Sequence, residues 1–106
     1  MSAVIAEQFR PLRKNTLRGF ARVRFPSGLI LDEVSIHASE SGKAWAAPPA
    51  RPVIDPEGNP VRGRDGKLRY AAVVSFSEAK VRTNWSEQCV AAVREKFPQA
   101  LGENLK

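Results

Sequence analysis

A strict alternation of residue types between residues 16 and 25 is the feature that most constrains the fold of this chain. Successive side chains of a β-strand point to opposite faces, so a period of two predicts a strand with two chemically different faces. One face is small and apolar and suits packing, whereas the other carries arginines around a phenyl ring. The apolar face consists of Gly19, Ala21, Val23 and Phe25, and the basic face of Arg18, Phe20, Arg22 and Arg24.

The next residues predict a hairpin, because Pro26-Ser27-Gly28 combines a fixed φ with a residue that tolerates positive φ. The second strand, residues 29–38, alternates less regularly. Asp32 interrupts its main apolar face, and Leu29 and Leu31 point the other way. Either a β-bulge near Asp32-Glu33 resets the register, or both faces are partly buried, as at a dimer contact. The sequence leaves both interpretations open.

The rest of the chain predicts two further strands, a long loop and one helix. Residues 43–47 form a short third strand, and residues 68–76 form a fourth that is apolar on both sides, as expected of a central strand. Between them, residues 50–67 are rich in Pro, Gly, Asp and Arg and predict a long exposed excursion. From Ser77 as N-cap, apolar residues recur at helical spacing up to Pro98, so we expect a helix that covers the sheet. This apolar stripe is Val81, Trp85, Cys89, Ala92, Val93 and Phe97.

The predicted architecture is one α+β domain over residues 16–98, with a four-stranded antiparallel sheet followed by one C-terminal helix (ββββα). A chain of 106 residues is long enough for one modest core and too short for two. Residues 1–15 are expected to form an extended basic arm, because Pro11 and the lack of periodicity argue against a regular element. Residues 99–106 are expected to be a flexible tail.

Positive charge is concentrated near the N-terminus, where residues 1–24 contain six basic residues and one acidic residue. The whole chain has a net charge of +6. Such a balance suits a polyanion, either nucleic acid or a membrane surface, and we favour nucleic acid because no basic amphipathic helix is apparent. The sequence shows no membrane-spanning run and no secretory signal, and its single cysteine, Cys89, fits a reducing compartment. These features predict a cytoplasmic protein, and the simpler alternative is a basic protein without a polyanion partner.

The sequence offers no constellation for catalysis, so we expect a protein that is not an enzyme and takes no cofactor, metal or small-molecule substrate. The single histidine, His37, has no recognisable partner, and Cys89 lies on the apolar stripe, where a buried hydrophobe is expected. No cysteine or histidine pair has metal-ligand spacing. The carboxylates at residues 32–33 and 55–57 match neither a nuclease centre nor a calcium loop. Glycines occur singly, without a phosphate-cradling loop.

Two aromatic residues are candidates for stacking on nucleic-acid bases. Phe20 lies among arginines, so its ring could stack on an unpaired base, or long arginine side chains could shield an exposed ring. Trp45, between alanines, either stacks on a base or fills the core. Further cations come from the arm and the excursion. The predicted nucleic-acid-binding residues are Arg13, Lys14, Arg18, Phe20, Arg22, Arg24, Lys43, Trp45, Arg62, Arg64, Lys67 and Arg69.

Turn and core positions between residues 16 and 97 form a recognisable pattern, made of Phe25–His37, Gly42–Trp45, Pro48, Pro52, Gly66–Tyr70 and Phe76. This pattern resembles small bacterial proteins of the stage V sporulation protein G (septation regulator) type and their relatives in alphaproteobacteria and phages. The resemblance implies a small homodimeric β-sheet protein with a C-terminal helix, which binds DNA or RNA and regulates transcription. The DNA-contacting residues of that family lie around the helix and its C-terminal end. Here that region has few basic groups beyond Lys80, Arg82, Arg94 and Lys96.

The layout is also similar to the single-strand-binding domains of the Whirly and transcriptional-coactivator type, which bind melted DNA on the sheet face of a dimer. The shared features are four strands before a helix and a basic excursion with Asp-Pro-Glu-Gly before the last strand. The leading hypothesis is a homodimeric module for nucleic acid, with single-stranded DNA or RNA favoured. A homodimer is expected because one helix leaves the other sheet face and its edges uncovered. The alternative is a protein-interaction module whose basic face binds an acidic partner protein.

Overall fold

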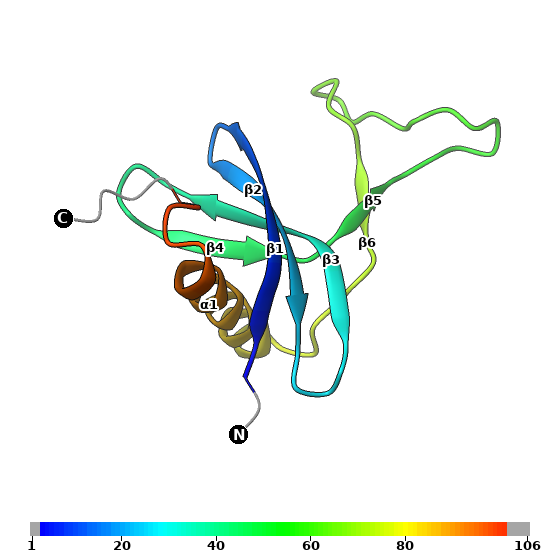
Figure 1. Ribbon diagram of the computed structural model, residues 1–106. Helices are drawn as coiled ribbons and strands as arrows, with labels where there is room; N and C mark the ends of the chain where they lie inside the picture. The colour runs from blue at the N-terminus through cyan, green and yellow to red at the C-terminus, as the bar shows by residue number, and fades with distance from the viewer. Residues whose placement is uncertain (1–2, 102–106) are drawn as a thin grey trace.

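The computed structural model describes residues 3–101 and shows a four-stranded antiparallel sheet, in the order β1-β2-β3-β4, followed by one helix (Figure 1). This confirms the predicted α+β class. A separate two-stranded sheet, β5-β6, lies outside the main sheet. The elements are β1 (Ile5–Lys14), β2 (Leu17–Arg24), β3 (Ile30–Ala38), β4 (Ala44–Ala47), β5 (Ala50–Pro52), β6 (Tyr70–Ala72) and α1 (Ala79–Lys96).

The main sheet contains a strand that the sequence pattern did not predict. Residues 1–15 were predicted to be an arm outside the domain, but Ile5–Lys14 forms edge strand β1, which pairs with β2 along its length. Register shifts at residues 6–8 and 11–14 break the period of two, so the alternation of a strand is absent from this sequence. Pro11 is compatible with an edge strand because one side of that strand needs no ladder hydrogen bonds.

The predicted fourth strand is not part of the main sheet. Of residues 68–76, only Tyr70–Ala72 is a strand, and it pairs with β5. The apolar residues of this segment indicated a buried central strand, but Tyr70 is 60% exposed and Val73 is 59% exposed. The sheet nevertheless has four strands because β1 supplies the one that this segment does not.

The irregular alternation of β3 has its cause in a β-bulge. Glu33 has a φ of 61°, and the register shifts between the partners of Ala21 and Val23. The extra residue brings Leu31 opposite Val23, on the side of the sheet that packs against the core. The first of the two interpretations is therefore confirmed. Leu31 needs no dimer partner for cover, and Leu29 lies exposed in the β2–β3 turn.

Helix α1 packs against one face of the sheet, where it contacts β1 and β4 (Figure 1). The small face of β2 is buried there as predicted, and a Cβ on Gly19 would lie 2.5 Å from both Arg10 O and Phe9 Cζ. The Ala46 backbone N–H donates a 2.8 Å hydrogen bond to Ser86 Oγ, which joins β4 to the helix. The buried helix residues are Cys89, Val90, Ala92 and Val93.

The two ends of the predicted helix differ from the prediction. Its N-cap is Glu78 instead of Ser77, and Val81 at the start of the apolar stripe is 42% exposed. After the helix, residues 99–101 do not behave as the start of a flexible tail, because Leu101 is only 3% exposed. The rest of the predicted tail lies outside the described residues. No helix within residues 3–101 is long and apolar enough to cross a membrane.

Candidate nucleic-acid interface

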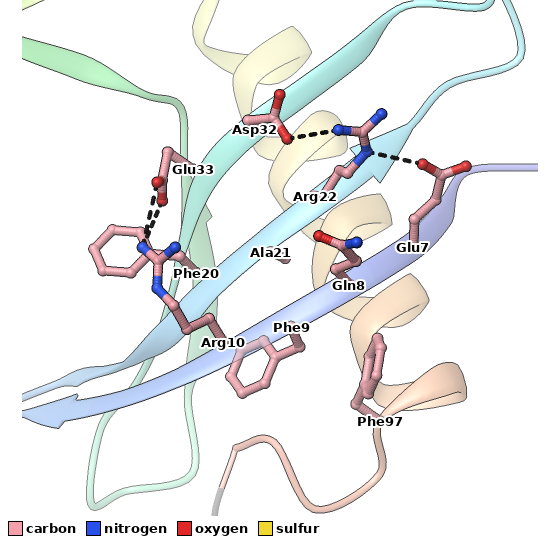
Figure 2. A pocket seen from close by; sticks show the side chains of 10 residues that line it. All are labelled: Glu7, Gln8, Phe9, Arg10, Phe20, Ala21, Arg22, Asp32, Glu33 and Phe97. Carbon is pink, nitrogen blue, oxygen red and sulfur yellow. Dashed lines mark hydrogen bonds and ion pairs between the residues drawn. The ribbon is translucent and has the colours of Figure 1, made fainter.

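The sheet face opposite α1, which we call the open face, carries Arg22 and Arg24 of the predicted set, but neighbouring carboxylates neutralise them. Arg22 Nε lies 3.1 Å from Glu7 Oε1, and Arg22 Nη1 lies 3.2 Å from Asp32 Oδ1 (Figure 2). Arg24 Nε lies 2.8 Å from Glu7 Oε2. The hydrogen bond to Glu7 and the negative charge of Asp32 raise the pKa of Arg22. Guanidinium groups held in this way have carboxylate competitors for any phosphate.

Arg18 is buried and is not presented to solvent as part of an exposed basic face, which corrects the prediction. A register shift between Leu17 and Gly19 breaks the alternation of β2 at this point, and Arg18 is only 9% exposed. Its Nη1 donates hydrogen bonds to the carbonyl oxygens of Asn15, at 2.7 Å, and Leu17, at 3.2 Å. The guanidinium therefore satisfies backbone acceptors near the β1–β2 turn instead of facing a ligand.

Both predicted stacking residues, Phe20 and Trp45, already have a partner for one ring face. The guanidinium carbon of Arg10 lies 5.2 Å from the Phe20 ring centroid, and Arg10 Nη2 pairs with Glu33 Oε2 at 2.9 Å (Figure 2). The Trp45 ring stacks on His37 with centroids 5.4 Å apart and an interplanar angle of 3°. The open face is thus a network of internal cation–π, stacking and ionic contacts.

His37 is held by two hydroxyl groups. Its Nδ1 lies 3.1 Å from Thr16 Oγ1, and its Nε2 lies 3.1 Å from Ser35 Oγ. Burial, and then the positive charge of Arg18, lower the pKa of His37 below its usual value of 6.5. Burial therefore favours the neutral imidazole, which donates through one ring nitrogen and accepts through the other.

The predicted excursion is a branched hairpin, which we define as residues 50–72. It starts with the β5–β6 pair and then divides into two turns, closed by hydrogen bonds from Gly58 N to Asp55 O and from Gly66 N to Gly63 O. At the division, Val53, Val61 and Arg69 form a closed ring of backbone hydrogen bonds. Val53 N donates to Arg69 O, Arg69 N to Val61 O, and Val61 N to Val53 O, at 2.9 to 3.0 Å. Figure 1 shows the two branches extending away from the main sheet.

The two branches carry opposite charge. The first, residues 54–60, has two acidic residues and no basic one, whereas the second, residues 61–69, has four basic residues and one acidic residue. We call the second the basic branch. Asp65 Oδ1 accepts a 3.0 Å hydrogen bond from the backbone N–H of Lys67, and Arg62 Nη1 donates a 2.8 Å hydrogen bond to Gly66 O. No carboxylate in the described part of the chain forms an ion pair with the exposed cations Arg64, Lys67 and Arg69.

The remaining predicted cations are exposed but dispersed. Arg13 and Lys14 end β1, and Lys43 precedes β4. None of these sites belongs to the branched hairpin. The structure therefore gathers only Arg62, Arg64, Lys67 and Arg69 of the predicted set on one protruding segment.

A groove of about 720 Å³ lies between the open face and the root of the branched hairpin. The sequence interpretation missed its most exposed aromatic residue, Tyr70, because the apolar run around it indicated a buried strand. The signal that could have found it is its position directly after Lys67-Leu68-Arg69, since aromatic residues interleaved with cations are typical of nucleic-acid-binding surfaces. The groove is lined by Arg10, Leu17, Phe20, Glu33, Ser35, His37, Pro48, Pro49, Ala50 and Tyr70.

A second cavity, of about 480 Å³, opens beside β1 and contains the paired groups of the open face together with Phe9 and Phe97 (Figure 2). Within residues 3–101, no three His, Cys, Asp or Glu side chains gather as a metal site. The comparisons found no family model, curated protein or solved structure that matches this chain. The resemblances to the stage V sporulation protein G and Whirly types therefore stay predictions.

Proposed function

We propose that the protein binds nucleic acid through the basic branch, with single strands preferred over duplexes. The observation that carries the proposal is the set of exposed cations at Arg64, Lys67 and Arg69, which protrude from the domain without carboxylate partners. Phosphate contacts by such side chains release counterions from the nucleic acid, and this release supplies most of the affinity that is independent of sequence.

The arginines of β2 have a smaller role in this proposal than the sequence suggested. Each arginine must give up an ion pair with Glu7 or Asp32 before it can hold a phosphate. The loss of that ion pair offsets part of the binding free energy gained from the phosphate contact. The basic branch has no such cost. We therefore place the principal phosphate contacts on the branch and treat Arg22 and Arg24 as secondary contacts.

The proposal also includes a cytoplasmic, regulatory and non-catalytic homodimer. β1 is an edge strand of ten residues with an exposed side, and Ile5 and Leu12 on it are 38% and 52% exposed. Long edges of this kind favour pairing with another strand, which supports a dimer formed along β1. A monomeric mass in light scattering at micromolar concentration would contradict this part of the proposal.

The direct test is fluorescence anisotropy with random single-stranded and duplex oligonucleotides at two salt concentrations. The double variant Arg64→Glu/Lys67→Glu should lose binding to both. The matched control is Lys80→Glu/Arg82→Glu, which makes the same charge change on the exposed first turns of α1 and should keep most of the affinity. Loss of binding only in the control would move the interface to the helix. Failure of the parent protein to bind any oligonucleotide would overturn the proposal in favour of an acidic protein partner.

A further inference from the structure

The groove at the root of the branched hairpin has dimensions suited to a small ring. Its volume of about 720 Å³ falls within the range of about 300–1,000 Å³ that is typical of small-ligand sites. Three parts of the molecule line the groove. The open face contributes Ser35 and His37, and β6 contributes Tyr70. The connection after β4 contributes Pro48 and Pro49. The groove therefore lies where the sheet and the branched hairpin meet.

Tyr70 differs from the other aromatic residues near the groove because no ring or cation in the described structure covers it. Tyr70 is 60% exposed, whereas Phe20 lies under Arg10 and Trp45 is stacked on His37. Exposed tyrosine at a binding surface offers a large flat contact at low entropic cost. Tyr70 is thus the aromatic ring in this groove that is most available to a ligand.

His37 supplies a second ring. It lines the groove and stacks on Trp45, which does not line it. Its two hydroxyl contacts fix its orientation. Ser35 Oγ is close to the same ring and lines the groove as well, which provides a polar group for the edge of a heterocycle.

We infer that this groove receives one unpaired nucleobase, stacked against Tyr70, while the basic branch holds the adjoining phosphates. The inference rests on the proposed nucleic-acid binding and assigns its preference for single strands to a site. A flat heterocycle with a polar edge matches aromatic rings beside a hydroxyl and an imidazole. Tyr70 is the first residue of β6 and follows Arg69 directly, so the stacking ring and a phosphate-binding cation are neighbours in the chain. Bases in a duplex are stacked and paired, so only a single strand can supply one without unpairing.

The test compares oligothymidylate of about 12 nucleotides, within the range of known single-strand sites, with an abasic strand of the same length and charge. The abasic strand keeps every phosphate and lacks every base. The parent protein should bind oligothymidylate at least about fivefold more tightly, because stacking of one base contributes about 1–3 kcal/mol. Tyr70→Ala should lower the affinity for oligothymidylate to that for the abasic strand. The affinity for the abasic strand should not change. Tyr70→Phe should keep the preference because the ring remains.

The matched control is Val73→Ala, since Val73 is 59% exposed and close to Tyr70 in the chain but does not line the groove. It should leave both affinities unchanged. Equal binding of the two strands by the parent would overturn the groove assignment while the proposed function stands. A loss by Tyr70→Ala that is equal for both strands would also overturn it, because Tyr70 would then only support the hairpin. If the parent binds neither strand, the proposed function fails and the groove assignment fails with it.

Discussion

The open face of the sheet and the branched hairpin both carry arginines and aromatic rings, but they differ in how far those groups are satisfied internally. On the open face, Arg22 pairs with two carboxylates and Trp45 is stacked on an imidazole. On the branched hairpin, Arg64 has no carboxylate partner in the described structure and Tyr70 no ring partner. Residue type alone therefore does not locate an interface. We therefore place the proposed interface at the groups that have no internal partner.

The largest expected effect comes from removing the branched hairpin above β5 and β6. Pro52 and Tyr70 face each other across that pair, so a two-residue Asn-Gly turn can replace residues 53–69. We expect oligonucleotide binding to be lost in anisotropy measurements. The free energy of unfolding should change by no more than about 2 kcal/mol, because each halving of a loop changes its closure entropy by only about 0.6 kcal/mol.

Urea denaturation separates the two outcomes of that deletion. A folded variant that still binds single strands with parent affinity would show that the open face is the interface after all. A variant that fails to fold would show that the branched hairpin is part of the cooperative core. Either outcome would contradict the view that the branched hairpin carries the binding groups and the sheet carries the stability.

The sheet should respond in the opposite way. Ile36 is fully buried in β3, and Ile36→Ala should lower the free energy of unfolding by about 2–5 kcal/mol in urea denaturation. Ile54→Ala on the branched hairpin is the matched control. Ile54 is 49% exposed, so this substitution should lower the free energy of unfolding by much less. Similar losses at the two positions would contradict the view that stability resides in the sheet and α1.

The sequence predicted the packed side of the sheet better than its open side. Gly19, Ala21 and Val23 alternate with larger residues, and all three are buried as expected. The partner of Arg22 could not be predicted, because Glu7 belongs to a strand whose bulges and Pro11 hide its period. Pairing across strands depends on register, which a local pattern does not fix when bulges intervene.

The proposed site could be predicted only in part, for the same reason. The cations of the basic branch were identified because a polar turn-rich segment is exposed whatever its detailed fold. Tyr70 was missed because an apolar run can be a buried strand or an exposed one, and tertiary packing decides between them. Arg18 was assigned wrongly to an exposed face, because a register shift beside it breaks the alternation of β2 and the residue is buried.

Salt dependence sharpens the comparison of the two arginine sets. Arg64→Gln/Lys67→Gln should flatten the slope of log affinity against log salt by about 1.4 for single strands, or about 0.7 for each lost phosphate contact. Arg22→Gln/Arg24→Gln removes the same charge but breaks ion pairs with Glu7 and Asp32, so its slope should change by much less. Titrations of both variants at several salt concentrations provide the comparison. Equal slopes for the two variants would place phosphate on both surfaces.

The smallest expected effect concerns pH and belongs to the sheet alone, because the only histidine of the chain lies there. The unfolded chain protonates His37 near pH 6.5, whereas burial and Arg18 lower its pKa in the folded state. Below pH 6.5 the unfolded state therefore binds more protons than the folded state, so the free energy of unfolding falls as the pH falls. His37→Asn should flatten this dependence between pH 7 and about pH 5.5, before most carboxylates titrate. Melting temperatures measured across that interval test the assignment, and a parent protein that becomes more stable on acidification would show that His37 gains a favourable partner when it is charged.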